Sequence, residues 1–526
     1  MGIYLNPGNG MFQKSLDSAI YVDKSGLIEK ASALVGTRDC YLCVSRPRRF
    51  GKTMALDMLA AYYGRGCDSH AQFEGLAISS SDVFGRHLNK YDVIKVTMTN
   101  FLTRGGGTVR GAICLLEELV KDELAHAFPD ARVSSDHPLS VWLERVYGLT
   151  GVPFVFLIDE WDCVMREFQG DESAQKEYLD WLRDLLKDQE YVGLAYATGI
   201  LPVKKYGQHS ALNMFDEVTV LDARPFSEFT GFTEAEVEAL CVRYGADMDE
   251  MRRWYDGYCV DGLSIYNPRS VVASLAKGAF GNYWTRTETF EALRRYVMLD
   301  MGGLRGKVVE LISGGEVAVN VDKFANDMTT FRGADDVLTL LVHLGYLTYD
   351  ASARVVRVPN SEVAHEFASS VEDDVDWKPL ADAIADSERA WAALLSGDVD
   401  LAAELVGRSH ADAASALAYN DENSLACAVS LAFYAARRSH LIEREAPAGK
   451  GFADVVFRPR PGVSAPAVVV ELKAGGAPED ALEQIRRKGY ADALSAYPEV
   501  VLVGMSYDPD SKSPGYKDHR CAIERL

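Results

Sequence analysis

Apolar runs and amphipathic stretches alternate along the first two hundred residues. Apolar residues at helical spacing predict helices over 21–35, 55–63 and 109–127. Continuous or alternating apolar runs predict strands over 41–44, 92–101, 154–158 and 191–201. Continuous apolar runs are typical of strands that are buried on both faces of a parallel sheet. The order of elements therefore predicts an α/β domain with a parallel sheet built from βαβ units.

The pattern changes after residue 230. Residues 230–271 are helical and aromatic, and residues 334–367 predict a helix, Gly345, two strands joined by a hairpin, and a second helix. That outline fits a winged-helix or lid subdomain, which binds DNA in some proteins and covers the nucleotide in others. An alanine-rich helical stretch over 387–418 predicts a connector. We therefore expect four parts: 1–285, 286–370, 371–415 and 416–526.

The loop between the strand at 41–44 and the next helix has the sequence SRPRRFGKT. Strand, loop, Gly51-Lys52-Thr53 and helix is the order of a phosphate-binding P-loop. The N–H groups at a helix start attract anions, Lys52 would reach the β- and γ-phosphates of a nucleotide, and the Thr53 hydroxyl would bind Mg²⁺. The expected cofactors are ATP and Mg²⁺.

This loop departs from the common P-loop pattern at one position. The pattern GxxxxGK[ST] has a glycine five residues before Gly51, and this chain has Arg46 there. Taken alone, the stretch fits a nucleotide-binding loop and a basic turn equally well. Four arginines are candidates for a contact with the γ-phosphate, and the sequence does not rank them: Arg46, Arg48, Arg49 and Arg269.

An acidic pair follows the apolar run at 154–158. Asp159 and Glu160 stand at the carboxyl end of this strand, where ligands bind in open α/β sheets. As a Walker B element, Asp159 would hold Mg²⁺ and Glu160 would polarise the attacking water. The alternative is an acidic pair that caps the next helix. Thr198, at the end of the strand over 191–201, is the candidate that senses the γ-phosphate, although Thr-Gly also commonly ends strands.

Composition narrows the protein class. A length of 526 residues with 48% hydrophobic and 25% charged residues is typical of a globular protein of two to four domains. The net charge of −22 argues against a surface that binds nucleic acid nonspecifically, but it leaves room for a local basic groove. Nine scattered cysteines, no apolar run of transmembrane length and no signal-peptide pattern predict a cytoplasmic protein without membrane contact.

The last hundred residues carry a different chemistry. Asp454 lies within an apolar strand, and Glu471 and Lys473 end the next apolar run. Glu471 and Lys473 are two apart on a strand and therefore point to the same face. Asp454 and Glu471 would bind Mg²⁺ at a scissile phosphate, with Lys473 as a positive charge for the transition state. The alternative is an internal set of ion pairs among these three residues.

Ordered motifs along nearly the whole chain resemble a bacterial and archaeal family of AAA-ATPase-like proteins with a carboxyl-terminal PD-(D/E)XK nuclease domain. The motifs are YVDKSGLI, SRPRRFGKT, FEGL, FLIDEWD, ATGIL, WYDGY, YNPRSV, LGYLTY, VPNSEV, GFADVVF and ELK. In this family the P-loop itself reads RPRRFGK[ST], so Arg46 is a family feature.

The resemblance implies specific site residues. In the P-loop, ATP would be bound by Gly51, Lys52 and Thr53, and we expect the adjoining Arg49 and Phe50 to belong to the same site. The Walker B pair would be Asp159 and Glu160. A restriction-endonuclease-like core would place Glu422, Asp454, Glu471, Lys473 and Gln484 at its site. Family members often have a histidine after the first glutamate, and this chain has NSLACAV instead. The role of Glu422 therefore stays open, with Asp421 and Glu443 as substitutes.

Two functions follow as hypotheses. The first is an ATPase coupled to a Mg²⁺-dependent nuclease that acts on DNA, with Glu160, Asp454, Glu471 and Lys473 as its catalytic residues. The second is an ATP-dependent switch or scaffold whose nuclease-like domain grips nucleic acid or protein without cutting. A ring-shaped homo-oligomer, a dimer and a monomer are all compatible with the sequence.

Overall fold

The structure is a computed structural model that describes residues 2–203, 212–284, 296, 299, 301–324, 331–372, 377–414, 422–448, 451–460, 463–508 and 518–526. Contacts within the chain divide it into two compact units. Unit 1 comprises Met1–Trp284 and Asn320–Ala351, and unit 2 comprises Thr285–Val319 and Ser352–Leu526. The segment 286–370, which the sequence groups as one subdomain, contributes residues to both units. The four sequence-based boundaries stay a prediction.

Unit 1 is built on a five-stranded sheet of order β2-β3-β4-β1-β5. Its strands are β1 (Tyr41–Ser45), β2 (Asp92–Thr97), β3 (Phe154–Asp159), β4 (Val192–Gly199) and β5 (Asp216–Val218). Each neighbouring pair is parallel, and every residue of β1, β3 and β4 is buried. This confirms the expected α/β fold and the parallel sheet. Strand β4 lies between β1 and β3, so the P-loop and the acidic pair follow strands that are not adjacent.

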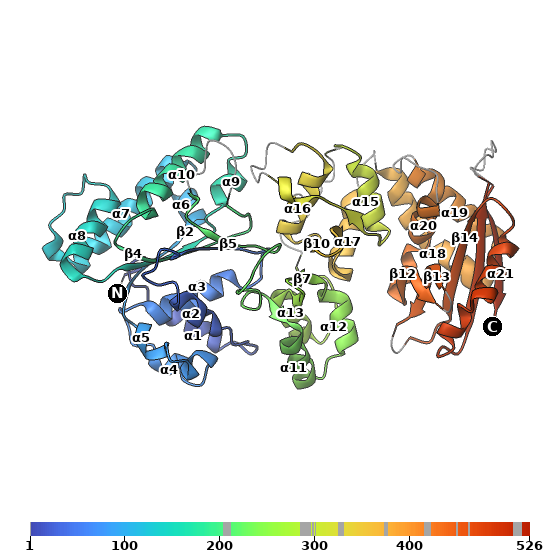
Figure 1. The fold of residues 1–526 in the computed structure, drawn as a ribbon, viewed down its shortest axis with the longest axis horizontal. Helices are drawn as coiled ribbons and strands as arrows, with labels where there is room; N and C mark the ends of the chain where they lie inside the picture. Colours follow the sequence, from blue (N-terminus) through green and yellow to red (C-terminus); the bar gives the residue numbers. More distant parts are fainter. Residues whose placement is uncertain are drawn as a thin grey trace. The chain divides into compact units, whose positions relative to one another are not determined.

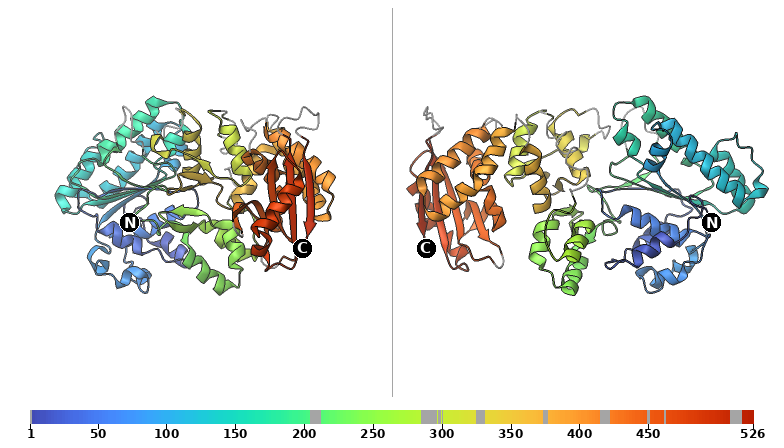
Figure 2. Two further views of the ribbon diagram at one scale, coloured as in Figure 1. Left: turned by 45° about the vertical axis from the view of Figure 1, so that its right-hand side comes forward. Right: turned by 180° about the vertical axis from the view of Figure 1, so that it is seen from behind.

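Helices cover both faces of this sheet (Figure 1). The face below the sheet in that view carries α1 (Gly10–Leu16), α2 (Gly26–Ser32) and α3 (Lys52–Tyr63). The opposite face carries α6 (Met98–Arg104), α7 (Val109–Ala127), α8 (Leu139–Thr150) and α10 (Glu172–Leu186). The same two layers are visible from behind in Figure 2. The short helices α4 (His70–Phe73), α5 (Phe84–His87) and α9 (Cys163–Glu167) complete this part of unit 1.

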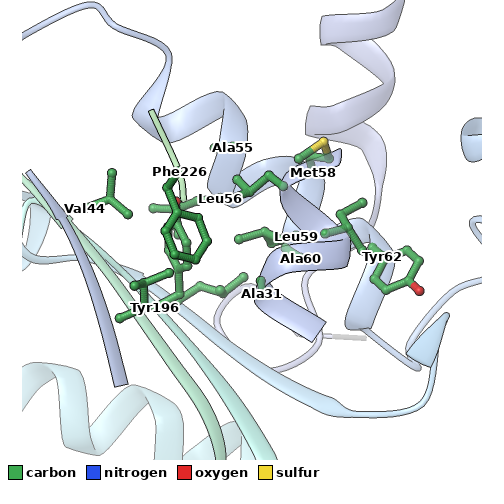
Figure 3. Close-up of a cluster of buried hydrophobic side chains, with 14 of the residues drawn as sticks. Ala31, Val44, Ala55, Leu56, Met58, Leu59, Ala60, Tyr62, Tyr196 and Phe226 are labelled. Carbon is green, nitrogen blue, oxygen red and sulfur yellow. The ribbon is translucent and has the colours of Figure 1, made fainter. Parts of the chain in front are cut away.

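The P-loop helix is anchored in the core of unit 1. Leu56 and Leu59 on α3 are fully buried and lie beside Val44 of β1 and Tyr196 of β4 (Figure 3). Burying side chains of this size contributes about 1.5–3 kcal/mol each to the free energy of unfolding. The first turn of α3 is therefore fixed against the sheet edge where β1 ends.

Two elements of unit 1 are shorter than the sequence predicts. The helix expected over 21–35 is confined to α2, because Asp23 accepts a hydrogen bond from the backbone N–H of Ser25 (2.8 Å) and forms a turn before Gly26. The strand expected over 92–101 ends at Thr97, and α6 begins at Met98. The helix expected over 109–127 is confirmed as α7.

The remainder of unit 1 packs around a three-stranded sheet of order β6-β8-β7. Its elements are β6 (Phe232–Thr233), α11 (Glu234–Tyr244), α12 (Met248–Tyr255), β7 (Tyr258–Val260), β8 (Leu263–Tyr266), α13 (Pro268–Lys277), α16 (Ala334–Leu344) and β10 (Thr348–Asp350). Helix α11 starts with a capping box in which Thr233 and Glu236 satisfy each other's backbone N–H groups. Lys24 joins this helix to the amino-terminal segment through an ion pair with Glu236 at 2.6 Å.

Unit 2 holds a second five-stranded sheet, of order β12-β13-β14-β15-β16. Its strands are β12 (His440–Ala448), β13 (Gly451–Pro459), β14 (Ala467–Ala474), β15 (Val500–Tyr507) and β16 (Arg520–Arg525). Only the β14–β15 pair is parallel, so the sheet is mixed. Figure 2 shows these strands side by side with helices packed against them. This is the expected carboxyl-terminal α/β domain.

Helices flank this second sheet on both faces. The hydrophobic cluster on one face draws on α18 (Lys378–Ser396), α19 (Val399–Ala414) and α20 (Glu422–Ala432). The cluster on the other face draws on α21 (Pro478–Lys488). Unit 2 also contains α15 (Leu304–Ile312), β9 (Val317–Ala318), β11 (Val355–Arg357) and α17 (Ser361–Glu372). Among the described residues, no helix combines the length and the apolar character that crossing a membrane requires.

Candidate nucleotide and nuclease sites

The loop between β1 and α3 turns at Gly51 directly into a helix start, a position whose backbone N–H groups can bind an anion. Gly51 has φ +88°, a left-handed conformation that favours glycine, and helix α3 begins at the next residue. Lys52 is buried, and its ammonium group donates to the carbonyl oxygens of Arg46 and Pro47, both at 2.8 Å. Burial lowers the pKa of Lys52 to about 8, although Asp159 acts in the opposite direction. The loop thus holds a desolvated amine at a helix start.

Arg46 turns away from the loop and into the protein. Its side chain is 1% exposed, and its Nη1 donates to the carbonyl oxygens of Ser45 (3.1 Å) and Val218 (3.4 Å). Burial lowers the pKa of Arg46 to about 10. Of the four arginines that the sequence leaves as γ-phosphate candidates, Arg46 is therefore excluded by its position. The sequence could not show this, because the partner Val218 lies 172 residues away.

The second half of unit 1 supports the loop from outside. The Phe50 ring is buried and meets Tyr258 edge to face at 5.2 Å, and the Phe50 carbonyl accepts from the N–H of Gly231 at 2.9 Å. The Tyr258 hydroxyl in turn donates to the carbonyl of Gly345 at 2.9 Å. A Cβ atom at Gly345 would lie 2.7 Å from the Cβ of Pro47, so glycine is required there. The motifs WYDGY and LGYLTY therefore hold the P-loop in shape, and the Phe50 side chain belongs to the core.

The acidic end of β3 meets the start of α3. The Thr53 hydroxyl donates to Asp159 Oδ2 at 2.7 Å, and the Thr198 hydroxyl donates to Asp159 Oδ1 at 2.6 Å. Asp159 is 2% exposed. Thr53 and Thr198 therefore meet at the carboxylate of Asp159, as the sequence expects, although the three residues come from three separate elements. The donor set of Thr53 hydroxyl and Asp159 carboxylate fits Mg²⁺, which prefers oxygen ligands.

Glu160 is held by a residue that the sequence analysis missed. The hydroxyl of Thr99, on α6, donates to Glu160 Oε2. Glu160 itself has φ +52°, an uncommon conformation for a residue with a side chain. Thr99 follows β2 and Glu160 follows β3, and the two strands are neighbours in the sheet. The pairing of these two residues therefore depends on the strand order, which only the structure shows.

Asp162 locks the acidic segment onto the end of β4. Its Oδ2 accepts from the backbone N–H groups of Ile200 (3.0 Å) and Leu201 (2.9 Å), and the side chain is fully buried. The N–H of Trp161 donates to the carbonyl of Thr198 at 3.0 Å. These bonds fix Thr198 relative to Asp159.

Replacing Gly199 with alanine is expected to destabilise unit 1. A Cβ atom there would lie 2.7 Å from Trp161 Nε1 and 3.0 Å from Asp162 Cγ, so the segment would have to shift. Overpacking of this kind costs about 1–3 kcal/mol. Thermal unfolding should show a lower midpoint. The control is Gly148→Ala on α8, where a Cβ atom meets nothing within 4 Å and alanine should raise the midpoint slightly. Equal midpoints for the two variants would contradict the packing argument.

In unit 2, the predicted nuclease residues converge on neighbouring strands. Glu471 on β14 is 2% exposed, and Asp454 on β13 accepts from the N–H of Leu472 at 2.7 Å. Lys473 Nζ lies 3.7 Å from Glu471 Oε1, and the amide of Gln484 on α21 donates to the same oxygen. Glu471 Oε2 is buried and has no hydrogen-bond partner among the described atoms. A buried carboxylate oxygen without a partner is costly, and a metal ion would satisfy it.

Electrostatics at this second site favour the binding of a cation. Burial, and after it the neighbouring charge of Asp454, raises the pKa of Glu471 to about 7. Lys473 and Lys488 act against this rise. Among the described residues, no group of three His, Cys, Asp or Glu side chains forms a ready metal cluster. Asp454 and Glu471 supply two carboxylates, a donor set that Mg²⁺ accepts when it keeps several of its waters.

Three further sequence candidates have separate outcomes. Glu443 on β12 pairs with Arg458, whose Nε lies 3.0 Å from Glu443 Oε2. Glu422 is the first residue of α20, and the placement of its side chain is outside the description. Asp421 lies outside the described residues.

Two separate parts of the chain match known protein families, one in each half of the sequence. Residues 12–208 match the AAA-ATPase_like family, described as "Predicted AAA-ATPase", and residues 420–514 match the PDDEXK_9 family of the PD-(D/E)XK nuclease superfamily. An "Uncharacterized protein in vnfD 5'region" from Azotobacter chroococcum mcd 1 is 30% identical over 283 residues, which cover 52% of this chain and 51% of that protein. The chain thus spans about half the length of this curated relative.

Solved structures give more distant likenesses. The Walker-type ATPase PABY2304 of Pyrococcus abyssi has a TM-score of 0.34 at 13% identity, over 65% of this chain and 94% of that chain. The Aeropyrum pernix ORC2 protein has a TM-score of 0.31 at 10% identity, over 69% of this chain and 93% of that chain. At these values the likenesses carry no functional information.

Proposed function

We propose that this chain, which carries an AAA-ATPase-like domain and a PD-(D/E)XK nuclease superfamily domain, binds and hydrolyses Mg·ATP and cleaves DNA in a Mg²⁺-dependent reaction. One observation carries the first half: the hydroxyl of Thr53 and the carboxylate of Asp159 are 2.7 Å apart although 106 residues separate them. A hydroxyl at the P-loop helix start beside a Walker B carboxylate is the arrangement that holds Mg²⁺ on a nucleotide.

The residues around this pair would divide the work of hydrolysis. Lys52 would neutralise the phosphates, and the α3 helix start would supply backbone N–H donors. Glu160 would orient and polarise the attacking water, and Thr99 sets the direction of that carboxylate. Bound Mg²⁺ would supply charge stabilisation at the phosphates. Thr198 would sense the γ-phosphate because its hydroxyl shares Asp159.

Support for the second half is the unpartnered, buried oxygen of Glu471 beside Asp454 and Lys473. The two carboxylates would hold a hydrated Mg²⁺, which stabilises charge on a phosphodiester and activates water. Lys473 would add a positive charge next to the developing negative charge.

The test measures both activities on the full chain. ATP turnover is followed by phosphate release with Mg²⁺, and cleavage is followed by the nicking of supercoiled plasmid DNA and the shortening of single-stranded DNA. Turnover and metal-dependent cleavage above background support the proposal. ATP binding with no cleavage under any metal or nucleotide would favour the switch or scaffold instead, and no nucleotide binding would refute the ATPase half.

A further inference from the structure

Arg166 lies on α9, the short helix that directly follows the DEWD segment. Its Nε donates to Asp162 Oδ2 at 3.2 Å, and its side chain is 14% exposed. The same Oδ2 atom is fixed by the N–H groups of Ile200 and Leu201. Arg166 is therefore a charged side chain whose inner end is anchored by a buried carboxylate.

The charge of Arg166 acts on the two residues that flank the expected γ-phosphate. Arg166 contributes to the lowered pKa of Lys52, and Glu160 interacts favourably with the Arg166 charge. Within the described part of the chain, the Nη1 and Nη2 atoms of Arg166 donate to no acceptor, whereas its Nε is bound. A guanidinium anchored at Nε presents two outer N–H groups in a fixed plane, which suits a phosphate oxygen.

We propose that Arg166 binds the γ-phosphate of ATP from within the same chain and lets the site distinguish ATP from ADP. The inference rests on the proposed binding of Mg·ATP. Arg46, the arginine that replaces a P-loop glycine, is turned into the core. Arg166 instead follows the acidic segment, and its Nε is bound to Asp162, two residues after Glu160. Asp162 also accepts hydrogen bonds from the backbone just after Thr198, at the end of β4. A γ-phosphate bound to Arg166 would therefore be linked through Asp162 to the segment that carries Thr198.

The test compares affinities for two nucleotides and not activity alone. Mg·ADP and Mg·ATPγS binding are measured by calorimetry on the wild-type chain, Arg166→Gln and the control Arg183→Gln. Arg183 on α10 makes surface ion pairs with Asp180 and Asp184. We expect Arg166→Gln to bind ADP within about twofold of wild type, to bind ATPγS about tenfold more weakly, and to lose about a hundredfold in kcat. Arg183→Gln should match the wild type.

Several outcomes would overturn the inference. If wild type binds both nucleotides and Arg166→Gln keeps the wild-type ratio of affinities, Arg166 does not contact the γ-phosphate. If Arg49→Gln loses the discrimination and Arg166→Gln keeps it, the contact belongs to Arg49. If Arg166→Gln does not fold, the same measurements are made on Arg166→Lys, which retains a positive charge beside Asp162. An equal loss of ADP and ATPγS affinity in Arg166→Lys would assign Arg166 a structural role. A wild-type chain that binds neither nucleotide would refute the proposed function itself.

Discussion

Replacing Lys52 with alanine is expected to reduce ATP turnover by about a hundredfold or more, because the loop then lacks its cation for the phosphates. The variant should still fold. The ammonium of Lys52 is buried and bonded to two neutral carbonyls, so its removal also removes a desolvation cost. Phosphate release and calorimetric binding of Mg·ATP measure the first effect, and thermal unfolding measures the second.

A matched control distinguishes the loss of the Lys52 amine at the site from the loss of one positive charge anywhere on the protein. Lys30 is exposed on α2, in the same helical layer as α3, and Lys30→Ala removes an equal charge outside the loop. Lys30→Ala should keep wild-type turnover. A Lys52→Ala variant that binds and turns over ATP as the wild type does would show that the loop is a basic turn without a nucleotide function.

The pKa of Lys52 gives this site a pH dependence. Its value in the folded chain, about 8, is below the ordinary 10.5, so the unfolded chain binds more protons between these values. This group therefore makes the free energy of unfolding rise as pH increases from about 8 to 10.5. ATP binding needs the charged amine, so affinity should fall above about pH 8, and binding there should take up a proton. Calorimetry in buffers of different ionisation enthalpy detects that uptake. The Lys52→Ala variant should show none.

Much of the candidate nucleotide site can be predicted because its signals are local. The buried runs of β1, β3 and β4 are continuous in the sequence, and parallel strands bring their carboxyl ends to one edge. From these facts alone, Thr53, Asp159 and Thr198 are expected to meet, and the structure places all three in contact.

The residues that the sequence did not identify act through distant partners. Thr99 reaches Glu160 across 61 positions, and Asp162 reaches Leu201 across 39. A threonine and an aspartate have many uses in a protein, so neither carries a local pattern that indicates these roles. Arg46 is the strongest example: a basic loop predicts a cation facing phosphate, but the side chain is buried against β5.

In unit 2 the central strands were predictable and the outer strands were not. Strands β13, β14 and β15 contain apolar runs, and the sequence locates all three. Strands β12 and β16 lie at the two edges of the sheet and carry charged residues such as Arg444 and Arg525. Edge strands bury only part of their surface, so their hydrophobic pattern is weak.

Replacing Glu471 with glutamine is expected to abolish metal-dependent cleavage of DNA. The substitution keeps the shape of the side chain and the contact with Gln484, but it removes the charge that a cation needs. The same substitution should stabilise the fold when no metal is bound. The pKa of Glu471, about 7, is above the ordinary 4.5, so the folded chain binds more protons between these values. This group therefore lowers the free energy of unfolding as pH rises from about 4.5 to 7.

The thermal unfolding midpoint of Glu471→Gln should therefore differ from that of the wild type without Mg²⁺, and so should its response to Mg²⁺. At pH 8 in EDTA its midpoint of thermal unfolding should exceed that of the wild type, because a buried charge has been removed. Mg²⁺ should then raise the wild-type midpoint and leave that of the variant unchanged, since only the carboxylate binds the ion. The control is Glu483→Gln, the exposed neighbour of Gln484 on α21, which should behave as wild type in both measurements.

The pH dependence of metal binding completes this prediction. Near pH 7, Mg²⁺ has to displace a proton from about half of the Glu471 side chains, so affinity should increase as pH rises from about 6 to 8 and then level off.

Lys473→Met should retain metal binding, because the positive charge of Lys473 repels the cation, and should lose cleavage. If Glu471→Gln cuts DNA at the wild-type rate, or if Mg²⁺ stabilises both proteins equally, Asp454, Glu471 and Lys473 form an internal set of ion pairs. The nuclease fold would then serve only to grip its partner.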